Sequence, residues 1–306
     1  MELTIGDDII DVGIVVFEGV QIIDYTGPYE VFGQASYRVF TISESGQPLT
    51  TAMGMRIHPT YSFKDSPNVD VLVIPGGNIH SVVENKRSID WIRDRAKISR
   101  HVLSVCNGAF ILAKTGLLDD KKATTFHRLL DQFESSAQKT KVVWDQRFVD
   151  NGKIVTTAGL SSGIDGALHL ISKLDGQGTA KSVALHLEYD WRPEENYARA
   201  ALADMHLPRI PAPNGAQIKI VKTKGTKSEW VKTYRLTGKD ARRASAYFYE
   251  QLRQHQWKQD SSAKQTTQQR TWRFEDRHGR KWSARTFFSH QNDVADFRIE
   301  SRLLSP

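Results

Sequence analysis

Cysteine is almost absent from this chain, which has one thiol, Cys106, in 306 residues. A single cysteine excludes an intrachain disulfide, and a free thiol is most stable in a reducing compartment. No apolar run approaches the roughly 18 residues that a membrane span needs. The N-terminal segment, with Glu2, Asp7 and Asp8, lacks the basic region of a signal peptide. We therefore expect a soluble, cytoplasmic protein without membrane contact.

Acidic residues are scarce in the last third of the chain. Residues 1–208 carry 21 Lys+Arg against 26 Asp+Glu, a net charge of −5, whereas residues 209–306 carry 21 against 9, a net charge of +12. The two values add up to the +7 of the whole chain. Such a reversal of charge along a chain of this length indicates two domains.

The first domain, placed at residues 1–190, has the pattern of an α/β sandwich. Val12–Phe17 and Val69–Ile74 are continuous apolar runs, typical of parallel strands that are covered on both faces. They alternate with helical segments such as the amphipathic Ser88–Arg100, and another helix is expected to begin near Pro28. Alternating strands and helices predict a mostly parallel sheet between helices.

The rest of the chain differs in composition. Residues 191–216 contain four prolines and little periodicity, which predicts a linker. Residues 217–306 are expected to form a small basic α+β domain of unknown role. Its predicted elements are a strand, Glu229–Leu236, a helix, Gly238–Gln256, and three antiparallel strands, Arg270–Glu275, Arg280–Phe288 and Asp296–Leu304. The polar stretch between the helix and these strands, Gln259–Gln269, is expected to be mobile.

Four tryptophans in this basic domain allow two interpretations: Trp230, Trp257, Trp272 and Trp282. With a charge of +12 they could stack on nucleic-acid bases, but small sheets depend on aromatic residues for their core. The domain also lacks the two short helices and tight turn of a helix-turn-helix. We therefore expect core tryptophans and no nucleic-acid partner.

The segment around Cys106 has the pattern of a nucleophile elbow. The run His101–Val105 predicts a buried strand, and the chain then changes to helical spacing. Small residues stand two positions before and after the cysteine, at Ser104 and Gly108, as a sharp strand-to-helix turn requires. A helix N-terminus favours the thiolate, and the N–H of Asn107 could face an oxyanion. A lone cysteine in an apolar segment can equally be a buried hydrophobe.

Two other segments are expected at the same edge of the sheet. Asp24 follows the strand Val12–Phe17, and Gly76 and Gly77 follow the strand Val69–Ile74. Open α/β folds bind ligands at the carboxyl ends of their strands, so the carboxylate and an N–H of the glycine turn can face one crevice. On pattern alone Asp24 could also be a loop or capping aspartate.

Six segments between residues 10 and 195 together resemble the ThiJ/PfpI superfamily, the class I glutamine amidotransferase-like proteins. In chain order they are Asp24-Tyr-Thr-Gly-Pro-Tyr-Glu-Val-Phe32, Ile74-Pro-Gly-Gly77, Val105-Cys-Asn-Gly-Ala109, Gly116-Leu-Leu with Ala123-Thr-Thr125, Thr157-Ala-Gly with Ser162-Gly-Ile-Asp165, and Leu187-Glu-Tyr189. The first is most similar to isocyanide hydratases and to the sensor halves of AraC-type regulators. The resemblance implies a flavodoxin-like sandwich, commonly a homodimer, and no cofactor or metal.

Carried over by position, the resemblance makes Cys106 the nucleophile and Asp24 the acid that faces it. Gly76, Gly77 and Asn107 would then be oxyanion or substrate contacts. The implied reaction is hydration of a small isocyanide to an N-formamide, through a thioimidate on the sulfur. Because acid and thiol would lie side by side, their titrations should be coupled, and a protonated Asp24 hydrogen-bonded to sulfur is one form the pair can take.

The sequence departs from the family in two places. The family commonly reads Ala-Thr-Thr-His, but here the histidine comes one residue later, at His127. A shift of one residue in extended chain turns a side chain to the opposite face, so His127 is a weak candidate, and Cys-Asp chemistry is favoured over a Cys-His hydrolase. Asn107 stands where hydratases tend to have threonine. Ser162 is a further weak candidate.

Two other functions fit a reactive Cys106. One is a thiol sensor or regulatory scaffold whose cysteine is oxidised or modified without turnover. The other is a glyoxalase- or amidase-type hydrolase of the same superfamily. Turnover separates the sensor from the enzymes, and a substrate screen separates the enzymes from each other.

Overall fold

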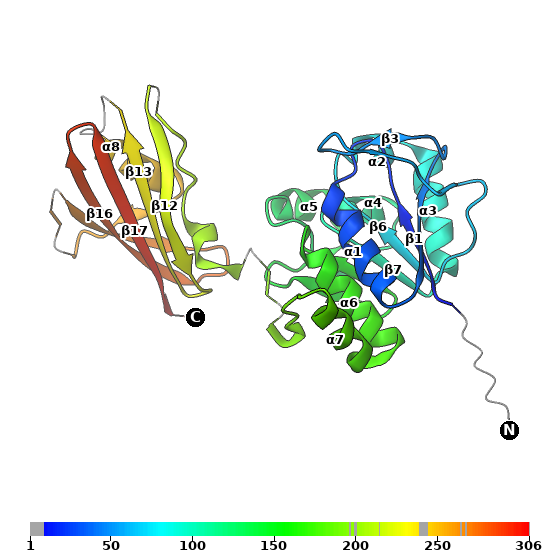
Figure 1. Ribbon diagram of the computed structural model, residues 1–306. Helices are drawn as coiled ribbons and strands as arrows, with labels where there is room; N and C mark the ends of the chain where they lie inside the picture. Colours follow the sequence, from blue (N-terminus) through cyan, green and yellow to red (C-terminus); the bar gives the residue numbers. More distant parts are fainter. Residues whose placement is uncertain are drawn as a thin grey trace. The chain divides into compact units, whose positions relative to one another are not determined.

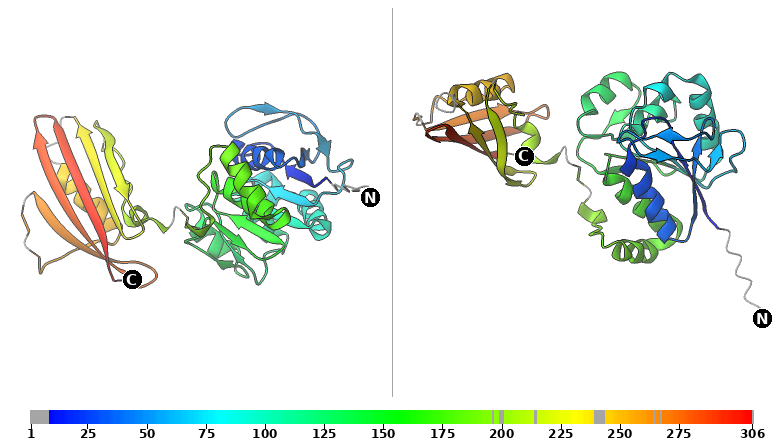
Figure 2. Two further views of the ribbon diagram at one scale, coloured as in Figure 1. Left: turned by 60° about the horizontal axis from the view of Figure 1, so that its bottom comes forward. Right: turned by 45° about the horizontal axis from the view of Figure 1, so that its top comes forward.

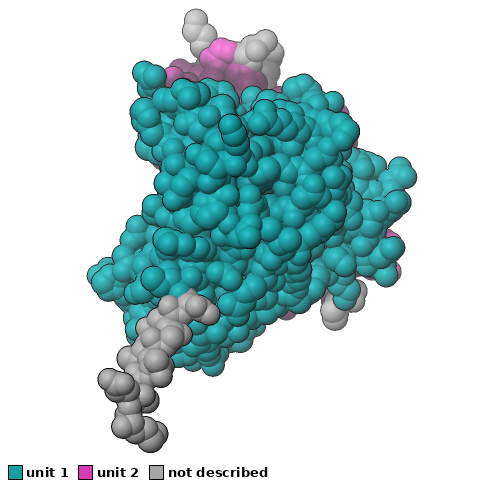
Figure 3. Space-filling view, turned by 90° about the vertical axis from the view of Figure 1, so that its right-hand side faces the viewer, with its two compact units in different colours: residues 1–199 teal, residues 200–306 magenta. Residues whose placement is uncertain are grey.

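The structure is a computed structural model that describes residues 9–195, 197–198, 201–213, 215–238, 244–263, 265–266 and 268–305. It divides into two compact units, Met1–Arg199 and Ala200–Pro306, shown in different colours in Figure 3. We call them unit 1 and unit 2. No helix in the described part of the chain is long and apolar enough to cross a membrane.

Unit 1 is built on a seven-stranded sheet with the strand order β10-β11-β7-β6-β1-β2-β5. Its strands are β1 (Asp11–Val15), β2 (Arg38–Ser43), β5 (Tyr61–Ser62), β6 (Val71–Ile74), β7 (His101–Ser104), β10 (Phe148–Asp150) and β11 (Ile154–Thr157). Every neighbouring pair is parallel except β10 and β11. The expected mostly parallel sheet is therefore confirmed, and its central strand β6 is buried along its whole length, as a continuous apolar run requires.

Two groups of helices pack on this sheet (Figure 1). One group is α1 (Ile22–Gln34), α6 (Ser162–Leu174) and α7 (Gly176–His186); the other is α2 (His80–Val83), α3 (Lys86–Ile98) and α4 (Gly108–Lys114). The remaining elements of unit 1 are short: β3 (Leu49–Thr50), β4 (Arg56–Ile57), β8 (Lys122–Ala123), β9 (Lys141–Val142), α5 (Leu130–Ser136) and the 3-10 turn η1 (Pro193–Glu195). Residues of both helix groups and of the sheet share one hydrophobic core.

Helix α1 begins at Ile22 and not near Pro28, which lies inside the helix. Proline in a helix interior removes a hydrogen bond. The buried side chains of Tyr25 and Phe32 offset that loss, because helices in proteins depend mainly on the packing of an apolar face. Asp24 therefore lies in the first helical turn rather than in a loop, still beside the carboxyl edge of the sheet.

Unit 2 is a six-stranded antiparallel sheet with the order β12-β13-β17-β16-β15-β14, and α8 covers one of its faces (Figure 2). Its elements are η3 (Ala203–His206), β12 (Gln217–Gly225), β13 (Glu229–Thr237), α8 (Ala244–Gln254), β14 (Lys258–Gln259), β15 (Gln269–Glu275), β16 (Lys281–Gln291) and β17 (Val294–Ser305). The helix was expected to begin at Gly238, which is described and lies before α8. Residues 239–243 of the expected helix, and residues 264 and 267 of the expected mobile stretch, lie outside the described residues. β12 was not predicted.

Aromatic side chains form the core of unit 2. Trp257, Trp272 and Trp282 are at most 1 % exposed, so the core interpretation is confirmed for these three, and Trp230 packs partly buried against the same core. Leu207 and Ile210 also lie in this core. These two were expected in the linker 191–216; they belong to unit 2 because burying their apolar side chains stabilises that domain more than leaving them in an exposed connection.

Candidate functional site

Cys106 lies at a sharp turn between β7 and α4. Its φ is +58°, in the left-handed region that few residues other than glycine adopt. The turn is fixed by neighbours: the N–H of Val105 donates to the Ile74 oxygen at 3.0 Å, and the Thr125 hydroxyl donates to the Cys106 oxygen at 2.8 Å. The strand-turn-helix geometry expected for a nucleophile elbow is present.

Two glycines allow other chain segments to approach this turn. A Cβ at Gly108 would lie 2.2 Å from the Ile74 oxygen, so the first residue of α4 has to be glycine. A Cβ at Gly159 would lie 3.1 Å from the Cys106 sulfur, and the φ of Gly159 is +123°. The loop after β11 therefore runs directly against the thiol.

Asp24 faces Cys106 from the first turn of α1. Its side chain is fully buried, and one carboxylate oxygen accepts the N–H of Gly76 at 3.1 Å. The other oxygen accepts the N–H of Leu160 at 3.2 Å, and the carboxylate also makes a hydrogen bond with the Cys106 thiol. The structure thus brings together Cys106, Asp24 and Gly76 from three different segments.

Burial controls the acidity of both groups. Burial raises the pKa of Asp24 to about 6, although the hydrogen bonds from Gly76, Leu160 and Cys106 oppose this shift. The pKa of the Cys106 thiol is raised by burial and by the nearby Asp24 charge, while the Asn107 N–H opposes the rise. Above pH 6 the pair therefore holds one proton, which the carboxylate and the thiol share. The expected helix-stabilised thiolate is not favoured, because the Asn107 N–H offsets only part of the effect of burial and of the Asp24 charge.

Asn107 and Gly77 are joined by two hydrogen bonds. The Gly77 N–H donates to Asn107 Oδ1 at 2.8 Å, and Asn107 Nδ2 donates to the Gly77 oxygen at 2.8 Å. An oxyanion donor must have its N–H available, whereas the amides of Gly76 and Gly77 already have acceptors. In this structure these two amides bind the side chains of Asp24 and Asn107. A groove of about 880 Å³ borders the elbow through Gly77 and Asn107.

The two weak candidates lie at the margin of this arrangement. His127 is in a turn after β8, half-buried, with its ring 4.3 Å from that of Phe126. Thr125, two residues earlier, is the residue of this segment that contacts Cys106. Ser162 is buried at the start of α6, where its N–H donates to the Gly159 oxygen at 3.1 Å.

Sequence reasoning did not single out Leu160 or Arg147. Leu160 contributes only its amide to Asp24, and a main-chain donor leaves no signature in residue type. Arg147 contacts the buried Asp165 of α6, with Nε 2.8 Å from the carboxylate. An arginine in a polar stretch gives no indication of such a partner 18 residues away.

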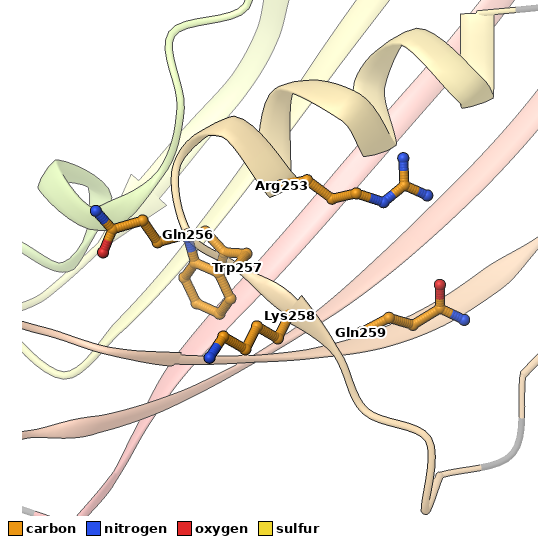
Figure 4. A pocket seen from close by; sticks show the side chains of 5 residues that line it. All are labelled: Arg253, Gln256, Trp257, Lys258 and Gln259. Carbon is orange, nitrogen blue, oxygen red and sulfur yellow. The ribbon is translucent and has the colours of Figure 1, made fainter.

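A second depression lies on unit 2, at the end of α8 (Figure 4). Arg253, Gln256, Lys258 and Gln259 surround the buried Trp257 there. These five side chains provide no carboxylate, thiol or hydroxyl group. Within the described residues, no group of three or more histidine, cysteine, aspartate or glutamate side chains is placed to bind a metal ion.

The comparisons with known proteins agree with this geometry. Residues 11–173 match the DJ-1/PfpI family, a segment that is more than half of the chain. The chain belongs to the DJ-1/PfpI family. Unit 2 lies outside the matched segment.

One curated relative is an isonitrile hydratase of Pseudomonas putida, 37 % identical over 185 residues, which are 59 % of this chain and 78 % of the relative. A second is the HTH-type transcriptional regulator GbdR of Pseudomonas aeruginosa, 23 % identical over 177 residues, which are 58 % of this chain and 48 % of the regulator. A crystal structure of a ThiJ/PfpI family protein from Pseudomonas syringae superposes with a TM-score of 0.56 and 28 % identity, covering 60 % of this chain and 77 % of that one. The flavodoxin-like fold of unit 1 and its kinship with an enzyme are thus established.

Proposed function

We propose that unit 1 is an enzyme that hydrates a small isocyanide to an N-formamide, with Cys106 as nucleophile and Asp24 as acid and base. The observation that carries the proposal is the buried hydrogen-bonded pair of a thiol and a carboxylate at a nucleophile elbow. The relative named isonitrile hydratase supports this kind of reaction.

In the first step the sulfur of Cys106 attacks the terminal carbon of the isocyanide. Asp24, ionised above pH 6, accepts the thiol proton and delivers it to the same carbon as negative charge develops there. The carbon gains one C–S and one C–H bond, and the product is a thioimidate on Cys106. A carboxylate with a pKa near neutrality suits both halves of this transfer.

In the second step water adds to the thioimidate carbon. Asp24 takes one proton from the water and passes it to the nitrogen, while the water oxygen bonds to the carbon. The C–S bond then breaks as the C=O bond forms, and Asp24 carries the hydroxyl proton to the departing sulfur, which releases the N-formamide. One carboxyl group serves both steps, because each begins with an ionised Asp24 and ends by restoring it.

The experiment is a turnover assay with isocyanides, glyoxals and amides, using wild type and Cys106→Ala. We expect N-formamide from at least one isocyanide, and loss of turnover in Cys106→Ala with an unchanged circular dichroism spectrum. Residual activity within about tenfold of wild type, a barrier change of only about 1.4 kcal/mol, would remove Cys106 from the mechanism. The matched control is Arg93→Gln, which removes an exposed ion pair with Asp90 on α3.

A thiol sensor is the second candidate, favoured by the match to a transcriptional regulator. It predicts stoichiometric oxidation or alkylation of Cys106 without turnover of any compound in the screen. Catalytic formation of product beyond one equivalent per chain would exclude the sensor as the sole function.

A further inference from the structure

The two amides that bind Asp24 are held in different ways. The Gly76 segment is tied back to α1, because the Gly76 oxygen accepts the Gln21 N–H at 2.9 Å. Leu160 has a φ of +52°, an uncommon conformation for leucine, and the residue is 38 % exposed, so burial of Leu160 itself cannot hold the loop. Neighbouring residues must therefore keep the Leu160 amide on Asp24.

Arg147 contacts this loop on both sides of Leu160. Its main-chain oxygen accepts the Ala158 N–H at 2.7 Å, before the loop. Its guanidinium reaches beyond the loop, where Nη2 lies 3.4 Å from the Ser161 hydroxyl and Nε donates to Asp165 at 2.8 Å. Arg147 thus connects the end of β11, through its main chain, to the first turn of α6, through its side chain.

Asp165 is the buried acceptor that holds the Arg147 side chain in place. It is 6 % exposed, and it also accepts the Tyr189 hydroxyl at 3.1 Å. Burial raises the pKa of Asp165, and the attraction of Arg147 opposes that shift. A buried carboxylate that loses its cation is strongly destabilised, so the Arg147–Asp165 pair is kept closed. Burial also raises the pKa of Tyr189 to about 12, so its hydroxyl stays protonated and donates.

We propose that Arg147 and Asp165 are positioning residues that act on Asp24 through the Leu160 amide. Neither touches the reacting atoms; their ion pair fixes the loop between Ala158 and Ser161. The proposal rests on the proposed function only in taking Asp24 as the acid of the site, and it requires no particular substrate.

A measurable consequence follows from the chemistry of carboxylates. A carboxylate that loses a hydrogen-bond donor is harder to ionise, so a loosened loop raises the pKa of Asp24. Alkylation of Cys106 reports this pKa. Its rate should rise with pH up to the pKa of Asp24 and then level off, because the pair then holds one shared proton. As the chain has one cysteine, iodoacetamide labelling reports this site alone.

The experiment compares full-length wild type, Arg147→Gln, Asp165→Asn and Arg147→Lys by the iodoacetamide rate between pH 4.5 and 9. In wild type we expect the rate to level off near pH 6. We call the pH at which the rate levels off the break. In Arg147→Gln and Asp165→Asn the break should move up by about half to one pH unit, a threefold to tenfold change in the acid constant of Asp24. Arg147→Lys should bring the break most of the way back to the wild-type value. The control Arg93→Gln should leave the break in place.

The variant Asp24→Asn shows whether the break comes from Asp24. Its alkylation rate should have no break near pH 6, and adding Arg147→Gln to it should not change the pH profile further. If Arg147→Gln does not fold, Tyr189→Phe, which removes one donor to Asp165, replaces it with a smaller expected shift in the same direction. Breaks within about 0.2 units of wild type in folded Asp165→Asn and Arg147→Gln would overturn the proposal. This readout needs no turnover, so the positioning role can hold or fail whether or not the protein hydrates isocyanides.

Discussion

Unit 1 and unit 2 each contain a buried aspartate, and the two are tuned in opposite directions. Asp24 accepts two main-chain amides, and burial raises its pKa to about 6. Asp276 of unit 2 accepts the Trp282 indole N–H at 2.9 Å, the Arg280 Nε at 2.8 Å and two main-chain amides. Burial opposes ionisation there too, but these donors lower the pKa of Asp276 to about 2.

The comparison shows that donors can outweigh burial: the indole and guanidinium donors lower the pKa of Asp276, whereas the amides and thiol at Asp24 do not offset its burial. Asp276 is neutralised by a cation and fixed in its charged form. No ion pair joins Asp24 to a cation in the part of the chain that the structure describes, and its neighbour is a thiol. A carboxylate in that setting can bind and release a proton near neutral pH, which is what acid–base catalysis requires.

Of the changes considered for the two aspartates, Asp24→Asn should have the largest effect, which is on turnover. We expect turnover to fall by roughly 100-fold or more, because an amide cannot accept the thiol proton. Cys106 should still be alkylated at alkaline pH, with a rate that shows no break near pH 6, because the thiol then ionises without a neighbouring base. The corresponding change in unit 2, Asp276→Asn, should leave turnover unaltered. Activity of Asp24→Asn within tenfold of wild type would show that the carboxylate is dispensable.

Asp276→Ala should instead cost stability. It leaves the Arg280 guanidinium and the buried Trp282 N–H without their acceptor. Arg280 is partly exposed and can bind water, so the expected cost is that of the unsatisfied indole N–H, about 1 to 3 kcal/mol. We expect a lower midpoint for unfolding of unit 2 in urea, followed by tryptophan fluorescence, with the Cys106 alkylation rate unchanged. An unaltered midpoint would mean that the hydrogen bonds of Asp276 do not stabilise unit 2.

The raised pKa of Asp24 should also make the free energy of unfolding depend on pH. A carboxyl whose folded pKa is raised contributes stability below its unfolded pKa and loses it as pH rises through the folded value. Between pH 4 and pH 8, wild type should therefore lose about 2 to 3 kcal/mol relative to Asp24→Asn. Urea denaturation of both proteins at the two pH values measures this difference. A constant difference would contradict the raised pKa.

Removal of unit 2 should have the smallest effect on the site. A chain ending at Arg199 keeps Tyr189 and also Ala198, whose N–H donates to the Asp145 oxygen at 2.7 Å. We expect it to be folded, with turnover and alkylation within about twofold of the full chain, because few contacts cross between such units. A chain ending at Leu207 is the informative control, since it retains apolar residues of the unit 2 core. Aggregation of both fragments would show that unit 2 completes the enzyme.

The parts of the fold that follow from local pattern could be predicted from the sequence. The apolar run of β6 and the small residues around Cys106 placed a central strand and the elbow correctly, and the position of Asp24 beside the carboxyl edge of the sheet followed from sheet topology. The start of α1 was misplaced, since the local preference of Pro28 for a first turn was overridden by tertiary packing. Strand β12 was missed because its side chains are almost all exposed and its stability comes from pairing with β13.

What the sequence could not provide were the contacts made by the main chain. Nothing in residue type shows that Leu160 donates its amide to Asp24, or that Asn107 occupies the Gly77 N–H. The acidity of the thiol was also misjudged, because the helix N-terminus is visible in sequence whereas the degree of burial is not. These contacts join segments that are far apart in the chain, so they can be identified only in the folded structure.

The central claim is that an ionised Asp24 works with Cys106 in catalysis, and the pH profile of isocyanide hydration tests it most directly. N-formamide formation by wild type should rise with pH and reach a plateau with an apparent pKa near 6 for kcat/KM. A rate that is flat between pH 5 and pH 8, or that rises only at the much higher pH where a buried thiol ionises unaided, would contradict the account.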